Sequence, residues 1–265
     1  MTNFDLYTIR CMTNMHVGSG NGNFGIIDNE VQRDVITGYP TINSSSLKGS
    51  IRNFLESIHD KDSVNKLLGS EENIGLYKVF SGMLLSIPFR SKNKPYYNVT
   101  CCRIIKELEE LLKSVGKNLD WLNMLKDLSL DLKSRSEIDL EGLKIDKYRT
   151  IDEVNKEYKD NIVQAMGENL IIIEEEKFNK LVKELPVIAR NKLDNGESKN
   201  LWYEEVVPRE TRFYFGIFKD SEKNNCNIFN DISDDAKLVQ IGGNATIGCG
   251  YCKINKELLG DVKNE

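Results

Sequence analysis

The chain has 265 residues, of which 40% are hydrophobic and 29% are charged, and its net charge is −5. This size and composition exclude an intrinsically disordered protein and fit one large domain or two small ones. No apolar run approaches the ~20 residues of a membrane span, and the N-terminus has no signal-peptide pattern, so we expect a cytoplasmic protein that makes no membrane contact. The acidic charge alone argues against a free-standing nucleic-acid-binding protein.

The first part of the chain predicts a strand, a glycine-rich loop and a helix. Residues 4–16 alternate apolar and polar side chains, which is typical of a strand. The loop GSGNGNFGIID follows at 18–28, and Gly38 and Pro40 mark a turn. Residues 44–59 have serines suited to an N-cap and an apolar stripe at helical spacing, so they predict a helix.

The rest of the chain mixes helical and strand patterns. In chain order, we expect amphipathic helices over 102–115 and 118–133, a stretch over 134–166 that is compatible with another helix, a strand over 168–175, a helix over 175–185, a hairpin over 186–207 with its turn at Asn195-Gly196, a strand over 212–219, a short helix over 231–240, a second glycine loop over 241–250 and a last strand over 251–258.

This order predicts an α+β fold with an antiparallel sheet. A ferredoxin-like (RRM-like) split βαβ core in a single domain over residues 1–265 fits it best, with a helical insertion at about 60–165.

The glycine loops do not match the common nucleotide sites. Residues 20–25 satisfy G-x-G-x-x-G, but no helical pattern follows, and no acidic residue stands about 20 positions later. The loop at 241–250 lacks the Gly-Lys-Ser/Thr of a P-loop. Cys249 and Cys252 form a C-x-x-C in a strand-like run without a second ligand pair, so we expect the six cysteines to be mostly free, buried thiols.

Four stretches together resemble the RAMP superfamily of CRISPR proteins, and more narrowly the repeated backbone subunit of the type III-B (Cmr) RNA-targeting complex. They are HVGSGNGNFGIIDNEVQRD at 16–34, TGYPTINSSSLKGSIR at 37–52, LWYEEVVPRETRFYFGI at 201–217 and IGGNATIGCG at 241–250. The equivalent subunit of the type III-A (Csm) complex is the main alternative. Gln32-Arg33 and the LWYEE run favour the Cmr type.

The resemblance covers both ends of the chain and the hairpin, but not residues 60–165. Two positions depart from the family pattern. Cys249 stands where many relatives have an arginine or lysine, so a phosphate contact there would need backbone N–H groups. Asn43 replaces a small residue before the serines.

The resemblance implies that the first glycine loop lies on target RNA and that Asp28 is catalytic, with His16 as a second candidate. RNA supplies its own nucleophile, the 2′-OH, so no serine or cysteine nucleophile is needed. Because a carboxylate with an ordinary pKa of about 3.9 is a poor base at neutral pH, we expect Asp28 to hold a divalent metal, Mg²⁺ or Mn²⁺. Glu204 and Glu205 are weaker candidates, of which at most one faces the site. From the residues alone, without the resemblance, a turn cap is the favoured role of Asp28.

The resemblance also implies RNA-binding residues. A hairpin at about 186–205 corresponds to the family's thumb, which separates guide from target RNA. The expected RNA contacts are Ser45, Ser46, Lys48, Arg52, Arg190, Lys192, Gly242, Gly243 and Gly248. The implied partners are guide RNA, target RNA, copies of the chain and other subunits of the complex. A guide-RNA scaffold that does not cut and a stand-alone nucleotide or redox enzyme are the alternatives.

Overall fold

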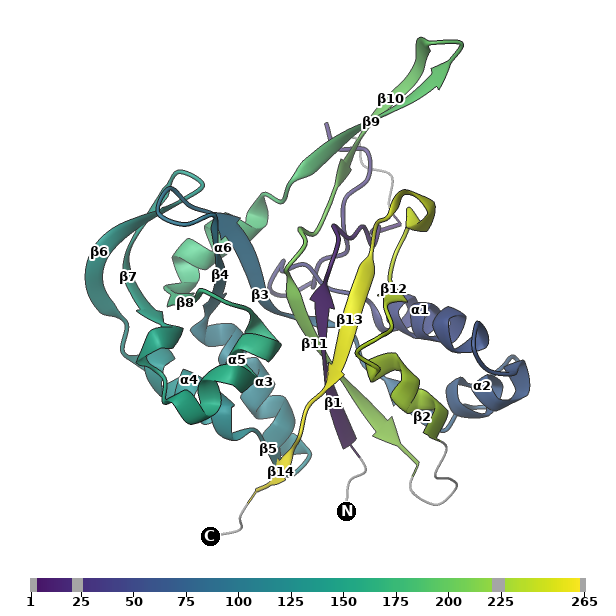
Figure 1. Ribbon diagram of the computed structural model, residues 1–265, viewed down its shortest axis with the longest axis horizontal. Coiled ribbons are helices and arrows are strands. Elements are labelled where there is room, and N and C mark those ends of the chain that lie inside the picture. Colours follow the sequence, from purple (N-terminus) through teal and green to yellow (C-terminus); the bar gives the residue numbers. More distant parts are fainter. Residues whose placement is uncertain (1–3, 21–25, 221–226, 263–265) are drawn as a thin grey trace.

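A large mixed β-sheet runs through the molecule in the computed structural model, which describes residues 4–20, 26–220 and 227–262 (Figure 1). Along the sheet, the strands lie in the order β12 (Val239–Gln240), β13 (Tyr251–Lys256), β1 (Phe4–Cys11), β11 (Arg212–Lys219), β3 (Met83–Arg90), β4 (Tyr96–Cys101), β8 (Leu170–Ile173), β7 (Leu143–Thr150) and β6 (Lys133–Leu140). A short strand, β2 (Tyr77–Val79), also pairs with β11. With its helices, this sheet makes the expected α+β fold.

One half of the sheet, which combines strands from both ends of the chain, is built on β1. This strand lies antiparallel to β13 on one side and to β11 on the other. Helix α1 (Ser44–Glu56) buries Leu47, Ile51 and Leu55, the stripe expected from the sequence. It packs against α2 (Lys61–Leu68) and the 3₁₀ helix η2 (Asn227–Ser233) beside the sheet (Figure 1).

The other half of the sheet carries α3 (Cys102–Ser114), α4 (Asp120–Leu130), α5 (Lys156–Met166) and α6 (Glu175–Lys183), with a 3₁₀ turn, η1 (Ile151–Glu153), before α5. Strand β8 pairs in parallel with β4, so the sheet is mixed and not wholly antiparallel as expected from the sequence. Near the C-terminus, β14 (Gly260–Asp261) pairs with β5 (Lys117–Asn118) between α3 and α4, so this strand lies against the same half of the molecule.

The expectation of a helical insertion over 60–165 is wrong in part, because β2 to β7 lie there together with α2 to α5. The buried runs MLLSIPFR and YYNVTC form β3 and β4, two central strands of the sheet. Short apolar runs of this kind cannot be told from helix segments by periodicity alone. The uncertain stretch over 134–166 holds the β6–β7 hairpin as well as the anticipated helix, α5.

The hairpin of β9 (Val187–Asp194) and β10 (Glu197–Glu205) projects from the body of the molecule and forms a sheet of its own (Figure 1). Its turn residues Asn195 and Gly196 have φ values of 51° and 85°, as a type I′ turn requires. Within the described residues, no helix is long and apolar enough to cross a membrane.

Candidate functional site

Asp28 is held at the root of the hairpin by the backbone of a single residue. Its carboxylate oxygen Oδ2 accepts a hydrogen bond of 2.7 Å from the N–H of Tyr203, and its own N–H donates to the Tyr203 carbonyl at 3.1 Å. Its side chain is exposed. Two hydrogen bonds therefore tie Asp28 to β10. Residues 21–25, the centre of the glycine motif, lie outside the described residues.

The segment after Asp28 continues along β10. Asn29 forms a parallel bridge with Glu204, and the Glu205 N–H donates to the Asn29 carbonyl at 2.9 Å. On the other side, Gly18 bridges Val31. The start of the loop at Gly18 is thus fixed to the segment after Asp28, and that segment is fixed to the hairpin.

Glu204 and Glu205 are both buried and point into different surroundings, as alternating strand positions do. Glu205 accepts from the N–H of Val31 at 3.1 Å and from Arg33 Nη2 at 2.5 Å. Glu204 instead accepts from Arg190 Nε at 2.9 Å and from Asn244 Nδ2 at 2.8 Å. The two carboxylates therefore join the hairpin to different loops.

His16 is buried between these elements. Its Nδ1 lies 2.7 Å from the Glu205 carbonyl, and since a carbonyl can only accept, Nδ1 carries the proton. Its Nε2 lies 3.9 Å from a carboxylate oxygen of Glu204. His16 thus contacts both glutamates at the hairpin root.

The second glycine loop packs on the backbone of His16. The Gly243 N–H donates to the His16 carbonyl at 2.8 Å. Gly242 has φ +87°, and a Cβ there would lie 2.2 Å from the same carbonyl oxygen. Gly248, at φ +80°, follows the 3₁₀ turn η3 (Ala245–Ile247) and faces open space. Packing therefore accounts for Gly242, whereas Gly248 leaves room for another molecule.

Arg190 and Lys192, the two hairpin residues expected to contact RNA, differ in whether other side chains already bind them. Arg190 binds Glu204, and its Nη2 also lies 3.7 Å from the Cys249 sulfur. Burial alone would lower the pKa of Arg190, but the Glu204 carboxylate raises it. Lys192 is exposed and has no ion pair within the described residues. Lys192 is therefore the freer of the two cations.

The side chain of Gln32 joins the segment that carries Asp28 to the start of α1, and the sequence did not predict this connection. Its Oε1 accepts from the N–H of Asn43 at 2.7 Å, and its Nε2 donates to Ser46 Oγ at 3.1 Å. Asn43 itself makes no side-chain cap. The side chain of Ser46 is thus occupied, whereas Ser45 is exposed.

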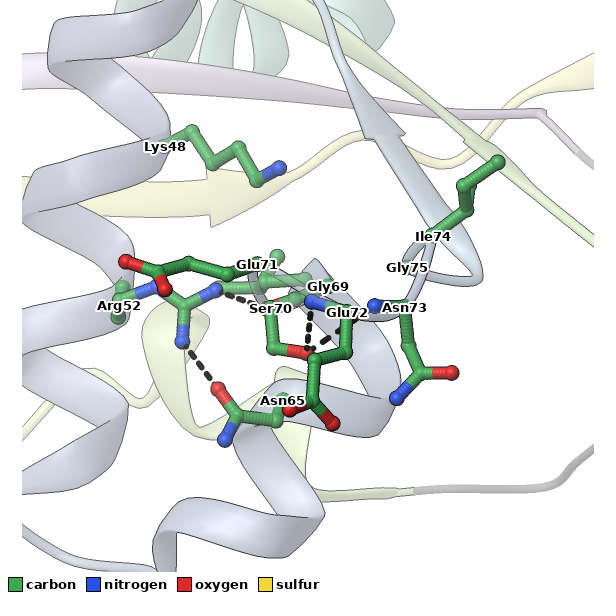
Figure 2. A pocket seen from close by; sticks show the side chains of 11 residues that line it. Lys48, Arg52, Asn65, Gly69, Ser70, Glu71, Glu72, Asn73, Ile74 and Gly75 are labelled. Atoms are coloured by element: carbon green, nitrogen blue, oxygen red, sulfur yellow. Dashed lines mark hydrogen bonds between the residues drawn. The ribbon is translucent and has the colours of Figure 1, made fainter.

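Lys48 and Arg52 line one pocket of about 750 Å³ beside α1, together with residues 69–75 (Figure 2). The Arg52 guanidinium donates to Glu56 at 3.1 Å, to Asn65 at 2.8 Å and to the Gly69 carbonyl at 2.5 Å. Arg52 therefore ties α1 to α2 and the loop after it. Lys48 extends over the pocket and forms no ion pair in the described parts of the chain (Figure 2).

The described residues do not form an all-protein metal site. Among them, no group of three or more His, Cys, Asp or Glu side chains is placed to hold a metal ion. Asp28 offers a single carboxylate at the surface. Such a carboxylate fits a Mg²⁺ ion that takes its other ligands from water and from substrate phosphates.

The five described cysteines are free thiols, as expected, and four of them are buried. Cys226 lies outside the described residues. Cys11 and Cys252 face each other across β1 and β13, and the contact to Cys11 together with burial raises the pKa of Cys252. The C-x-x-C thus forms part of the core and its edge rather than a metal site.

Comparison with known proteins gives one consistent match over nearly the whole chain. The model of the RAMP superfamily matches residues 8–253. The CRISPR system Cmr endoribonuclease Cmr4 of Pyrococcus furiosus is 29% identical over 278 aligned positions, which cover 94% of this chain and 93% of that protein.

The similar solved structures are also of Cmr proteins. A chain of the type III-B Cmr-beta complex in its apo state has a TM-score of 0.75 at 26% identity, with 96% of both chains covered. Oligomeric Cmr4 from Pyrococcus furiosus has a TM-score of 0.73 at 24% identity, with 99% of this chain and 100% of that chain covered.

Proposed function

This chain belongs to the RAMP superfamily, and from that premise we propose that it is the repeated backbone subunit of a type III-B CRISPR effector complex. In this role it binds guide RNA in several copies and cleaves the complementary target RNA. Asp28, held exposed at the root of a projecting hairpin, is the observation that carries the cleavage proposal. The named relatives are Cmr proteins, which favours the type III-B over the type III-A assignment.

A ferredoxin-like core is part of the proposal. The strand order β13–β1–β11–β3 supports it, because β1 and β3, joined through α1, lie on either side of β11. In the same way β11 and β13, joined through η2, lie on either side of β1. Two interleaved units of this kind are the split βαβ arrangement.

Guide RNA is proposed to run past the start of α1. Among the described residues, Ser45 and Lys48 there have no ion pair or capping bond, and helix N-terminal N–H groups add a favourable field for phosphates. Arg52 and Ser46 support this surface from within, because their polar groups already bind Asn65, Gly69 and Gln32.

Cleavage is proposed to use the RNA's own 2′-OH. The hairpin, with exposed Leu201 and Tyr203 near its root, unstacks a nucleotide pair and turns one ribose so that its 2′-OH lines up with the next phosphate. Asp28 lies directly beside Tyr203 and so meets the RNA at that nucleotide.

A divalent ion shared between Asp28 and RNA phosphates would stabilise the charge that develops on the scissile phosphate. His16 is proposed to position this arrangement through the Glu205 carbonyl, since its ring is buried.

The test is a cleavage assay on the assembled complex. Wild type, Asp28→Ala and Asn29→Ala are each assembled with guide RNA and partner subunits and given labelled complementary RNA, with Mg²⁺, with Mn²⁺ or with a chelator. Asn29 is a matched control because it is exposed and adjacent, and its ties to β10 come from its backbone.

We expect cuts at regular intervals in wild type and Asn29→Ala, and a loss of at least ~100-fold in rate in Asp28→Ala with RNA binding retained. Binding without cuts in every protein, with either metal, would instead identify a guide-RNA scaffold. Cuts that persist in the chelator would remove the metal from the proposal and leave Asp28 in place.

A further inference from the structure

A polar cavity of about 420 Å³ lies on the sheet beside α5, away from every element that the RNA proposal uses. Its basic lining consists of Arg10 on β1, Arg212 on β11 and Lys253 on β13. Among the described residues, none of the hairpin, of α1 or of either glycine loop lines it. The proposed function therefore leaves this cavity unexplained.

The three basic residues form a row across adjacent strands. Arg10 is the direct cross-strand partner of Arg212 in β11 and of Lys253 in β13. Directly opposed like charges destabilise a sheet. We call Lys253, Arg10 and Arg212 the cation row.

The acidic residues nearby compensate the cation row only in part. Glu210 forms an ion pair with each arginine. Its Oε1 lies 2.9 Å from Arg10 Nη2, and its Oε2 lies 3.3 Å from Arg212 Nη1. Glu168 and Asp235 also line the cavity, but no ion pair within 4.0 Å joins either to the cation row. Lys253 has no ion pair among the described residues.

Arg212 is the member of the row that is buried. Its side chain is 4% exposed, and its hydrogen bonds leave from Nη1, to the carbonyl and the carboxylate of Glu210. Its Nε is buried without a partner. Burial and the neighbouring Arg10 lower the pKa of Arg212, although Glu210 acts in the opposite direction. A buried charge with so few partners is costly unless another anion meets it.

We propose that this cavity binds an oxyanion, a phosphate or carboxylate group, on the cation row of Lys253, Arg10 and Arg212. Arginine presents planar N–H groups that match both kinds of oxyanion, and the lysine adds a point charge. The carboxylates of Glu168 and Asp235 on the lining favour an occupant that also carries hydrogen-bond donors. Such an occupant is either a free phosphate compound or an acidic side chain of a second copy of this chain.

The first arm of the test titrates inorganic phosphate into the full-length protein by calorimetry, with chloride keeping the ionic strength constant. The variants are Lys253→Gln and, as a matched control, Lys256→Gln on the same strand. Lys256 pairs with Asp5 and does not line the cavity. We avoid Arg212 because its loss would endanger folding.

We expect one phosphate per chain, bound at least 10-fold more weakly by Lys253→Gln and unchanged in Lys256→Gln. The second arm follows self-association by sedimentation. If Lys253→Gln weakens it and phosphate does the same to wild type, the occupant is a carboxylate of a second copy. If self-association is unchanged, the occupant is a free oxyanion.

Two results would overturn the proposal. One is the absence of phosphate binding together with unchanged self-association in Lys253→Gln. The other is an equal loss of phosphate binding in the two lysine variants, which would indicate general surface attraction. Target cleavage by Lys253→Gln, measured in parallel, separates this outcome from any failure of the Asp28 proposal.

Discussion

Arg33 and Glu205 join the segment that carries Asp28 to the root of the hairpin: Nη2 of Arg33 lies 2.5 Å from Oε1 of Glu205. Arg33 also donates to the carbonyls of Gly38 and Val182, so one guanidinium connects three parts of the chain. The Glu205 side chain is 5% exposed and that of Arg33 is 24% exposed, which places this ion pair at the edge of the core.

Replacing Glu205 by Ala is expected to lower the free energy of unfolding by about 3 kcal/mol, because it leaves the partly buried Arg33 guanidinium without its carboxylate partner and the Val31 N–H without its acceptor. Urea unfolding measures the change. Glu197→Ala on the same strand, where the side chain is 80% exposed, should change it by less than about 0.5 kcal/mol. Equal effects of the two changes would contradict the role of the ion pair.

Gly242→Ala is expected to destabilise the fold more than Gly248→Ala. Both glycines have positive φ, which costs an alanine about 1–2 kcal/mol. At Gly242 the new Cβ would also collide with the His16 carbonyl, whereas at Gly248 it would meet open space. The difference between the two Tm values therefore isolates the collision, and equal Tm values would show that the loop yields without cost.

Lys48 and Arg52 should separate RNA binding from folding. Lys48→Gln is expected to weaken guide-RNA binding and to reduce the salt dependence of affinity by about one unit of slope, with stability unchanged. Arg52→Gln is expected to lower stability, because Asn65 and Gly69 lose their donor (Figure 2). Filter binding at several salt concentrations and urea unfolding test both. A reversed pattern would make Arg52 the RNA contact.

Glu210 should contribute to the acid sensitivity of the fold. Burial alone would raise the pKa of Glu210, but Arg10 and Arg212 lower it below its ordinary value of 4.5. A lowered carboxyl pKa stabilises the folded state above pH 4.5, and this contribution is lost as the pH falls through the folded-state pKa.

Glu210→Gln is therefore expected to be less stable than wild type at pH 7, with the two proteins converging as the pH falls below 4.5. Unfolding curves across this range measure the effect. Glu184→Gln, at an exposed position without an ion pair in the described regions, serves as the control. A constant difference between wild type and Glu210→Gln at all pH values would rule out the linkage.

Local sequence patterns correctly predicted those helices and turns that depend on residues close together in the chain. The stripe Leu47, Ile51 and Leu55 identified α1, and Asn195-Gly196 identified the hairpin turn. Strands β3 and β4 were missed because a short buried run has the same apolar character in a helix and in a strand. Their assignment depends on neighbours in the sheet, such as β8, which lies about 70 residues later.

The candidate site shows the same limit. Asp28 could be chosen from a motif, but its anchor at Tyr203 lies 175 positions away. The sequence presents Arg52 and Arg190 simply as cations, and only the folded chain reveals that Asn65, Gly69 and Glu204 already occupy them. The cation row likewise brings together residues 10, 212 and 253, which no local pattern connects.

The attachment of Asp28 has an evolutionary consequence. Tyr203 holds it through its N–H and its carbonyl, groups that every amino acid except proline provides together. The side chain at position 203 can therefore change while the carboxylate beside it stays in place. A homologous chain with a different side chain there, proline excepted, would inherit the same backbone anchor for Asp28.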